Sequence, residues 1–186
     1  MCSMEALLRI RRYDASYSER AALADATRVV LRPLRPGDAG RLAAAFARLS
    51  QRTRALRFLC GKSELSPDEL RKLSDVDGEM QFAIVACLEN APDEMIGIVR
   101  FLRFEQDPAR AEVAATVVDE FQGRGLGRLL LLRLIEAARE RGVRAFHCEL
   151  AERNSPLLGL VHEVGLWPER CEGGVFAVEV PLPAVP

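Results

Sequence analysis

The sequence predicts a single domain of the mixed α/β class, with one central sheet flanked by helices. Its patterns follow the order strand, helices, three strands, helix, strand, helix and two strands, which is typical of a mixed α/β domain. A length of 186 residues is that of one ordinary domain. A composition of 49% hydrophobic and 28% charged residues is typical of a globular protein.

The first strand and the helices after it are indicated by local signals. A β-branched run that stops at two prolines predicts a strand over Arg28–Leu34. Asp38 then precedes apolar residues at helical spacing, and a second helical stretch covers Gln51–Leu59. Ser66 before Pro67 is typical of an N-cap followed by the first helical position, so a third helix begins there.

The middle of the chain predicts an antiparallel meander. Its three strands are Met80–Leu88, Met95–Phe104 and Ala109–Val118. Gly97 indicates a bulge, and Asp107-Pro108 indicates the turn before the third strand.

The last part of the chain predicts a long helix and a return to the sheet. The helix covers about Gly125–Arg141, and its core residues are Leu129–Leu132, Leu134 and Ile135. A strand over Val143–Leu150 follows, then a helix from Asn154 or Ser155 through Val164, and a hairpin across Gly173-Gly174. Residues 1–26 have weak periodicity and are expected to be a loosely attached arm before a domain over 27–183.

Charge and cysteine content exclude several classes of protein. The net charge is -1, so the basic excess of a nucleic-acid-binding protein is missing. Five cysteines without a C-x-x-C pair disfavour a disulfide framework and a zinc site. No signal peptide or membrane-spanning stretch is recognised, which predicts a cytoplasmic protein without a membrane partner.

The segment from 112 to 127, EVAATVVDEFQGRGLG, carries the chemistry. A strand enters a glycine-rich turn and then a helix, whose first amides are unpaired and lie at the positive end of the helix dipole. Glycines let backbone amides approach a ligand closely, which suits a phosphate or pyrophosphate. The residues concerned are Gly123, Gly125 and Gly127, with Arg124 and Arg128 adding positive charge.

Two nucleotide-binding motifs fit this segment poorly. A P-loop requires a lysine that is missing here. A Rossmann turn requires G-x-G-x-x-G directly after a strand, whereas G-x-G-x-G stands here, four residues beyond the strand.

The run Gln122-Gly123-Arg124-Gly125-Leu126-Gly127 fits the pattern Q/R-x-x-G-x-G/A. It resembles the acyl-CoA-binding motif of the GNAT N-acetyltransferase superfamily, and the element order is similar from about residue 28 to 182. The phrases LRPLRPGD, LSQRTRALRFL, AEVAATVVDEFQGRGLG and ARERGV are similar to the GNAT domain of bacterial protein lysine acetyltransferases.

The resemblance implies a mostly antiparallel sheet that splits where acetyl-CoA, the co-substrate, binds without a metal. Pantetheine would pair with the backbone of Val117 and Val118, and Asn154 would support it from the other side. The pyrophosphate would lie on the segment formed by Gln122, Gly123, Arg124, Gly125, Leu126, Gly127 and Arg128.

Glu112 is the predicted general base. Alternation along the strand gives Glu112 one face with Ala114, Thr116 and Val118, and it is the only carboxylate of that face. An amine with a pKa of about 10.4 must lose a proton before it attacks. The glutamate of the A-E-x-A phrase has this role in the lysine acetyltransferases that the chain resembles. The alternative is a solvated surface charge.

The group that donates a proton to the departing thiolate is not identified by the sequence. Many relatives have a tyrosine seven residues after the motif asparagine, where this chain has Val161. His162 is an alternative donor, or the thiolate leaves without a side-chain acid. The oxyanion is expected near the backbone N–H of Val118 or of its neighbour.

The predicted function is direct acetyl transfer from acetyl-CoA to a primary amine by a monomer or homodimer. The acceptor is either a protein lysine or a small amine, and acidic lining of a pocket built between Gly37 and Asp75 would favour a polyamine or lysine. A non-catalytic acyl-CoA sensor or interaction module is the alternative from another class.

Overall fold

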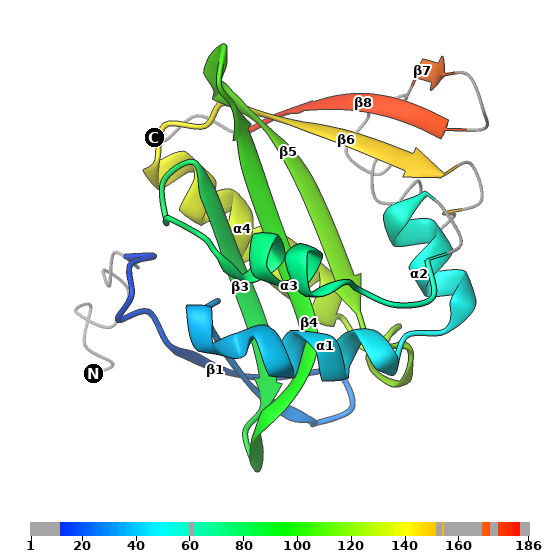
Figure 1. The fold of residues 1–186 in the computed structure, drawn as a ribbon. Coiled ribbons are helices and arrows are strands. Elements are labelled where there is room, and N and C mark those ends of the chain that lie inside the picture. Colours follow the sequence, from blue (N-terminus) through cyan, green and yellow to red (C-terminus); the bar gives the residue numbers. More distant parts are fainter. Residues whose placement is uncertain (1–11, 60–61, 152–153, 155–168, 172–174, 183–186) are drawn as a thin grey trace, which may run out of the picture.

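The structure is a computed structural model that describes residues 12–59, 62–151, 154, 169–171 and 175–182. In this part of the chain, strands form one sheet in the order β1-β2-β3-β4-β5-β6-β8-β7 (Figure 1). Their bounds are β1 Glu19–Ala22, β2 Arg28–Pro33, β3 Gln81–Leu88, β4 Ala91–Phe104, β5 Asp107–Val117, β6 Ala145–Ala151, β7 Glu169–Cys171 and β8 Val175–Pro181.

Helices cover both faces of this sheet (Figure 1). They are α1 Ala39–Ala47, α2 Gln51–Phe58, α3 Pro67–Ser74 and α4 Leu126–Glu140, with short 3-10 turns η2 Pro36–Asp38 and η3 Asp119–Phe121. Alternation along β3 directs Phe82 and Ile84 to the face that α4 covers and directs Ala83 and Val85 to the face that α1 and α3 cover.

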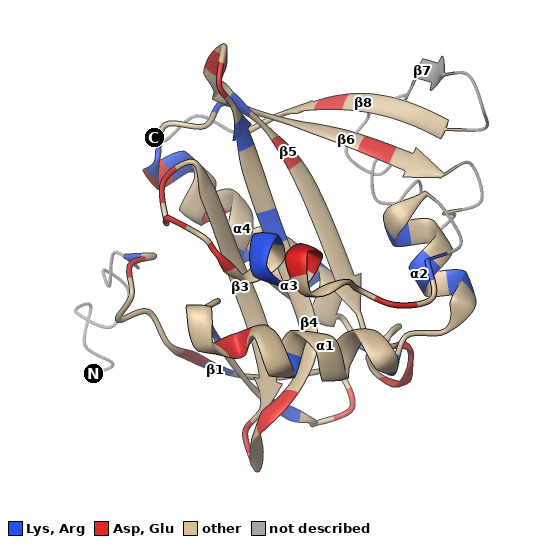
Figure 2. Ribbon diagram, in the orientation of Figure 1, with Lys and Arg blue, Asp and Glu red and all other residues tan. Residues whose placement is uncertain are grey.

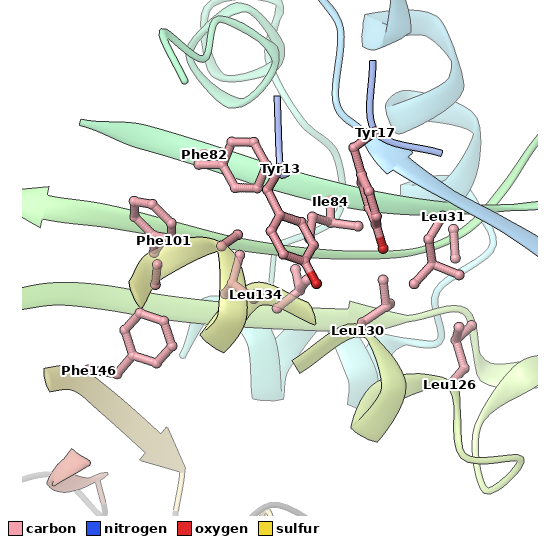
Figure 3. Close-up of a cluster of buried hydrophobic side chains, with 14 of the residues drawn as sticks. Tyr13, Tyr17, Leu31, Phe82, Ile84, Phe101, Leu126, Leu130, Leu134 and Phe146 are labelled. Carbon is pink, nitrogen blue, oxygen red and sulfur yellow. The ribbon is translucent and has the colours of Figure 1, made fainter. Parts of the chain in front are cut away.

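The larger core lies between the sheet and α4. Figure 3 shows aromatic side chains of the sheet, among them Phe101 and Phe146, packed against Leu130 and Leu134 of the helix. Gly97 lets α4 approach β4, because a Cβ atom at this position would lie 3.0 Å from Leu130 Cδ1. This close packing positions the beginning of α4 beside the strands that carry the predicted site.

The sheet splits between β5 and β6, as the family resemblance implied. Every other strand pair is antiparallel, but β5 and β6 are parallel and pair only from Arg110 with Ala145 to Glu112 with His147. Beyond these three pairs the two strands diverge (Figure 1). The remainder of β5 therefore has an unpaired edge within the described residues.

Several local predictions are confirmed. Ser66 caps α3 and exchanges hydrogen bonds with Glu69 in a capping box. The register of β3 and β4 shifts next to Gly97, where the bulge was expected. β7 and β8 form the terminal hairpin.

The predicted position of the turn before β5 is wrong. This turn lies at residues 105–106 rather than at Asp107-Pro108, because Asp107 already pairs with Phe104.

Residues 12–26 are not loosely attached, so that prediction is wrong for this part of the arm. β1 pairs with β2, and Tyr13 and Tyr17 are buried in the larger core (Figure 3). The Tyr13 N–H donates to Glu140, and Arg141 donates to the Tyr13 carbonyl oxygen at 2.7 Å. The division of the chain between residues 26 and 27 stays a prediction.

The prediction that Leu132 belongs to the core is also wrong, because its side chain is 48% exposed. It lies on the side of α4 opposite to Leu130 and Leu134, which are separated by one helical turn and buried. Of the helix predicted from Asn154 or Ser155 through Val164, only Asn154 is described, and the rest, including Val161 and His162, lies outside the described residues. No helix in the described part is long and apolar enough to span a membrane.

Candidate active site

The glycine-rich turn forms an open cradle of backbone at the beginning of α4. Gly123 and Gly125 have φ values of 72° and 87°, a left-handed conformation that glycine adopts without strain. A Cβ atom at either residue would meet nothing within 4 Å, so both face open space. Gly125 is the N-cap and supplies no side chain to the first amides of α4. These amides are therefore suited to an anionic group such as a pyrophosphate.

The other motif residues of α4 contribute differently. Leu126 is buried in the core at 1% exposure, so its side chain anchors the helix and only its backbone lies at the cradle. A Cβ atom at Gly127 would lie 3.8 Å from Val117 Cγ2, an ordinary contact. Arg128 is exposed on the first turn and has no ion pair among the described residues.

Arg124 already has a partner, which changes the expected charge of the cradle. Its Nη1 lies 2.5 Å from Asp25 Oδ2, and its guanidinium lies 5.1 Å from the centre of the Phe121 ring. Its backbone carbonyl also accepts a hydrogen bond from Ala24. Arg124 thus ties the turn to the β1–β2 loop, and Arg128 is the motif cation that has no counter-charge within the described residues.

Gln122 joins the turn to the open edge of β5. Its Nε2 donates to the Val117 carbonyl oxygen at 2.9 Å and to Thr53 Oγ1 of α2 at 3.3 Å. The side chain of Gln122 therefore positions the turn, and the cradle itself is formed by backbone.

The backbone of Val117 faces the split in the sheet. The Val118 N–H donates to the Ile96 carbonyl oxygen at 2.9 Å, which directs the Val118 N–H toward β4. Because backbone groups alternate in direction along an antiparallel strand, those of Val117 are directed toward the unpaired edge. The expected oxyanion donor is corrected accordingly: the Val118 N–H is already used, and only the neighbouring N–H remains a candidate.

Glu112 lies on the predicted face of β5. Ala114, Thr116 and Val118 line a narrow apolar pocket, and Glu112 lies with Ala114 in an adjoining wider one. Both pockets lie on the side of the sheet that α1, α2 and α3 cover. Figure 2 shows the acidic band on β5. The Glu112 side chain is exposed, at the place where β5 and β6 cease to pair.

Asp119 and Glu120 have structural partners, in keeping with the expectation that they are loop charges. Asp119 accepts hydrogen bonds from Ser50 and Thr53, which fix the beginning of α2 against η3. Burial raises the pKa of Asp119, but these hydrogen bonds outweigh it and hold the pKa below its ordinary value. Glu120 pairs with Arg48 at 2.6 Å.

The wider pocket contains cations that the sequence reasoning missed. Its charged lining consists of Arg57, Lys72, Asp75, Arg100 and Glu112, so cations outnumber carboxylates. The condition that would favour a polyamine or lysine, an acidic lining, is therefore not fulfilled by this pocket. A signal existed for Arg100, since an arginine interrupts the apolar strand MIGIVRFL opposite Ala114.

Cys148 of β6 lies near Glu112 but is not a reactive thiol. Burial, with smaller contributions from Glu112 and Glu149, raises its pKa to about 12. Asn154 follows β6 and donates its N–H to the Ala151 carbonyl oxygen, on the other side of the split from β5. Among the described residues, no group of three or more histidines, cysteines and carboxylates lies together.

Comparison with known proteins identifies the class to which this fold and site belong. The profile of the acetyltransferase (GNAT) domain family matches residues 28–166, and the chain belongs to this family. It is 33% identical to "Acetyltransferase PA5475" of Pseudomonas aeruginosa over 150 residues, which are 80% of each chain.

Two further relatives carry the name Pat. "Acetyltransferase Pat" of Mycolicibacterium smegmatis is 34% identical over 157 residues, and the match covers 83% of this chain but only 46% of that protein. The crystal structure of the GNAT domain of S. lividans PAT superposes with a TM-score of 0.82 at 28% identity, covering 92% of this chain and 100% of that one. The chain is thus a GNAT acetyltransferase.

Proposed function

We propose that this acetyltransferase moves the acetyl group of acetyl-CoA directly to a primary amine, with Glu112 as the general base. The observation that supports this most is that Glu112 lines a pocket at the split edge of β5. The same strand leads into the glycine cradle through Val117 and Gln122. The general base, Glu112, and the glycine cradle are therefore both held by the same strand, β5.

The cradle fits acetyl-CoA as substrate. The amides of Gly123 to Arg128 would hold its pyrophosphate, the backbone of Val117 would pair with its pantetheine, and Asn154 would support the pantetheine from the β6 side. The expected pairing with Val118 is not retained, because its N–H and its carbonyl oxygen already bond to Ile96 and Phe121. Open space beside Gly123 and Gly125 favours this assignment.

The chemistry requires a neutral amine. An alkylamine with a pKa of about 10.4 is protonated at neutral pH, and Glu112 would accept the proton that the nitrogen releases. The nitrogen then forms a bond to the acetyl carbon, the carbon–sulfur bond breaks, and CoA leaves as its thiolate. Burial raises the pKa of Cys148, which argues against this thiol as an acetylated intermediate and favours transfer in a ternary complex.

The test compares Glu112→Gln with the wild-type enzyme, using acetyl-CoA and a panel of primary amines. We expect kcat to fall by about 10² or more, because a general base contributes about 10²- to 10⁴-fold, while the Kd of acetyl-CoA is retained. Glu105→Gln, an exposed carboxylate in the β4–β5 turn, is the matched control. Equal kcat in wild type and Glu112→Gln would remove Glu112 from the mechanism.

A further inference from the structure

The wider pocket beside Glu112 holds two arginines whose charge no carboxylate balances directly. Arg57 comes from α2 and Arg100 from β4, and both line the pocket together with Glu112. Figure 2 shows basic colour on α2 and in the middle of β4, and an acidic band on the neighbouring strand β5. Among the described residues, neither arginine has a carboxylate oxygen within 4.0 Å.

Both guanidinium groups are held in place by neutral partners. Arg100 donates to the Gln81 side-chain oxygen at 2.7 Å and to the Leu73 carbonyl oxygen at 3.3 Å. Arg57 lies 4.9 Å from the centre of the Phe58 ring. The arginines are therefore oriented without being neutralised.

Burial disfavours the charged forms of Arg57 and Arg100 unless a negative group lies beside them. Burial lowers the pKa of Arg57 and of Arg100, and Arg100 lowers that of Arg57 further, whereas Glu112 opposes both changes. In this pocket the carboxylates of Glu112 and Asp75 face three cations, Arg57, Arg100 and Lys72, which leaves one positive charge in excess. One anionic group in this pocket would restore the balance.

We propose, resting on the proposed acetyl transfer at Glu112, that the acceptor is an amine carrying a carboxylate that Arg57 and Arg100 bind. A guanidinium is a planar fork that pairs with a carboxylate through two hydrogen bonds. The carboxylate would lie at the arginines while the amine faces Glu112. A polyamine would instead bring a second ammonium group to a pocket that already has an excess of cations.

Three small probes of equal length test the acceptor class. They are 5-aminopentanoate, its neutral amide 5-aminopentanamide, and 1,5-diaminopentane. We expect kcat/KM to be at least ten-fold higher for the carboxylate than for the amide and lowest for the diamine. Equal values for the carboxylate and the amide would exclude a free amino acid as the acceptor.

A second pair of probes distinguishes the two sources of such a carboxylate. Lysine peptides are compared with glutamate or glutamine beside the lysine. A preference for the glutamate peptide alone assigns the carboxylate to a polypeptide, and a preference for 5-aminopentanoate alone assigns it to a free amino acid. Absence of preference in both pairs contradicts the proposal.

The variant Arg57→Met keeps an unbranched apolar stem over Phe58 and removes the charge. We expect it to lower the carboxylate-to-amide ratio of kcat/KM to about one, while Arg57→Lys retains part of the preference. Arg52→Met, an exposed arginine on the same helix, should leave the ratio unchanged. An unchanged ratio in a folded Arg57→Met enzyme would overturn the assignment.

Binding of acetylated product separates this proposal from the proposed activity. 5-Acetamidopentanoate and its amide are titrated into the protein with CoA present. Tighter binding of the carboxylate, lost in Arg57→Met, supports the arginine site even where none of the probes is acetylated, and that outcome would count against the proposed activity alone. Acetylation of all three probes at equal rates would support the proposed acetyl transfer and count against the arginine site.

Discussion

The side-chain amide nitrogen of Gln122 lies 2.9 Å from the carbonyl oxygen of Val117 and donates a hydrogen bond to it. This hydrogen bond connects the end of β5, at its unpaired edge, to the beginning of the glycine-rich turn. A residue of the recognition motif thus shapes the site by holding two backbone segments together.

The first prediction concerns this hydrogen bond. Replacing Gln122 with leucine keeps the size of the side chain but removes the donor, at a cost of about 1 kcal/mol. If the loop binds acetyl-CoA, we expect Gln122→Leu to raise the Kd about five-fold, measured by isothermal titration. Gln106→Leu, in the exposed β4–β5 turn, should bind like the wild type. An unchanged Kd for Gln122→Leu would show that the hydrogen bond between Gln122 and Val117 does not contribute to the binding of acetyl-CoA.

A second prediction uses two glycines with the same backbone conformation. Gly125 and Gly142 have φ values of 87° and 78°, and both face open space. Alanine at either residue should lower the free energy of unfolding by about 1–2 kcal/mol through backbone strain. Titration with acetyl-CoA should detect weaker binding in Gly125→Ala alone, because Gly142 follows the far end of α4. Equal losses of affinity in both variants would point to a general effect of instability.

A third prediction concerns the contact between β4 and α4. Alanine at Gly97 would bring its Cβ atom to 3.0 Å from Leu130 Cδ1 and 3.3 Å from Leu126 Cδ2. Overpacking of this kind costs about 1–3 kcal/mol, which urea denaturation measures. In a Leu130→Ala background the additional cost of Gly97→Ala should largely disappear. Strict additivity of the two changes would show that the strain arises elsewhere.

A fourth prediction concerns pH and the buried Asp38, which is 1% exposed. It accepts hydrogen bonds from Arg32 at 2.6 and 2.8 Å, from Arg41 at 3.0 Å and from the Arg35 N–H at 2.9 Å. Burial alone raises the pKa of Asp38, but the Arg32 and Arg35 hydrogen bonds outweigh it and hold the pKa below the ordinary 3.8. The carboxylate therefore stabilises the fold above that pH, and this stability is lost as the pH falls through the lowered pKa.

Asp38→Asn should accordingly lower the free energy of unfolding by about 3–5 kcal/mol at pH 7, because it leaves Arg32 without its counter-charge. The difference from wild type should persist to about pH 4 and shrink in stronger acid, as followed by urea denaturation at each pH. Arg41→Gln removes a more exposed partner and should cost less. A difference that is independent of pH would contradict the ion-pair explanation.

The fold and the cradle could be predicted from the sequence because their signals are local. Periodicity, the Ser66 cap and the glycine spacing each depend on a few neighbouring residues, and the structure agrees with them. The split between β5 and β6 was expected only from the family resemblance, since parallel pairing leaves no trace in a single strand.

Other features depend on contacts between distant residues. Tyr13 lies in a segment of weak periodicity, yet it reaches Glu136 and Glu140 at the end of α4. No local pattern singles out Arg57, and only the packing of α2 beside β4 and β5 brings it into the same pocket as Arg100. The occupied Val118 N–H follows from strand register, which no motif specifies.

Tyr13 and Tyr17, the two tyrosines of the chain, have a practical consequence for the choice of where to truncate this protein. The family match starts at residue 28, the first residue of β2. A fragment cut there would lose β1 and would uncover both the core beneath Tyr13 and Tyr17 and a bare edge of β2. Bare edges recruit other strands, so such a fragment would tend to precipitate, and its inactivity would be mistaken for a defect in catalysis.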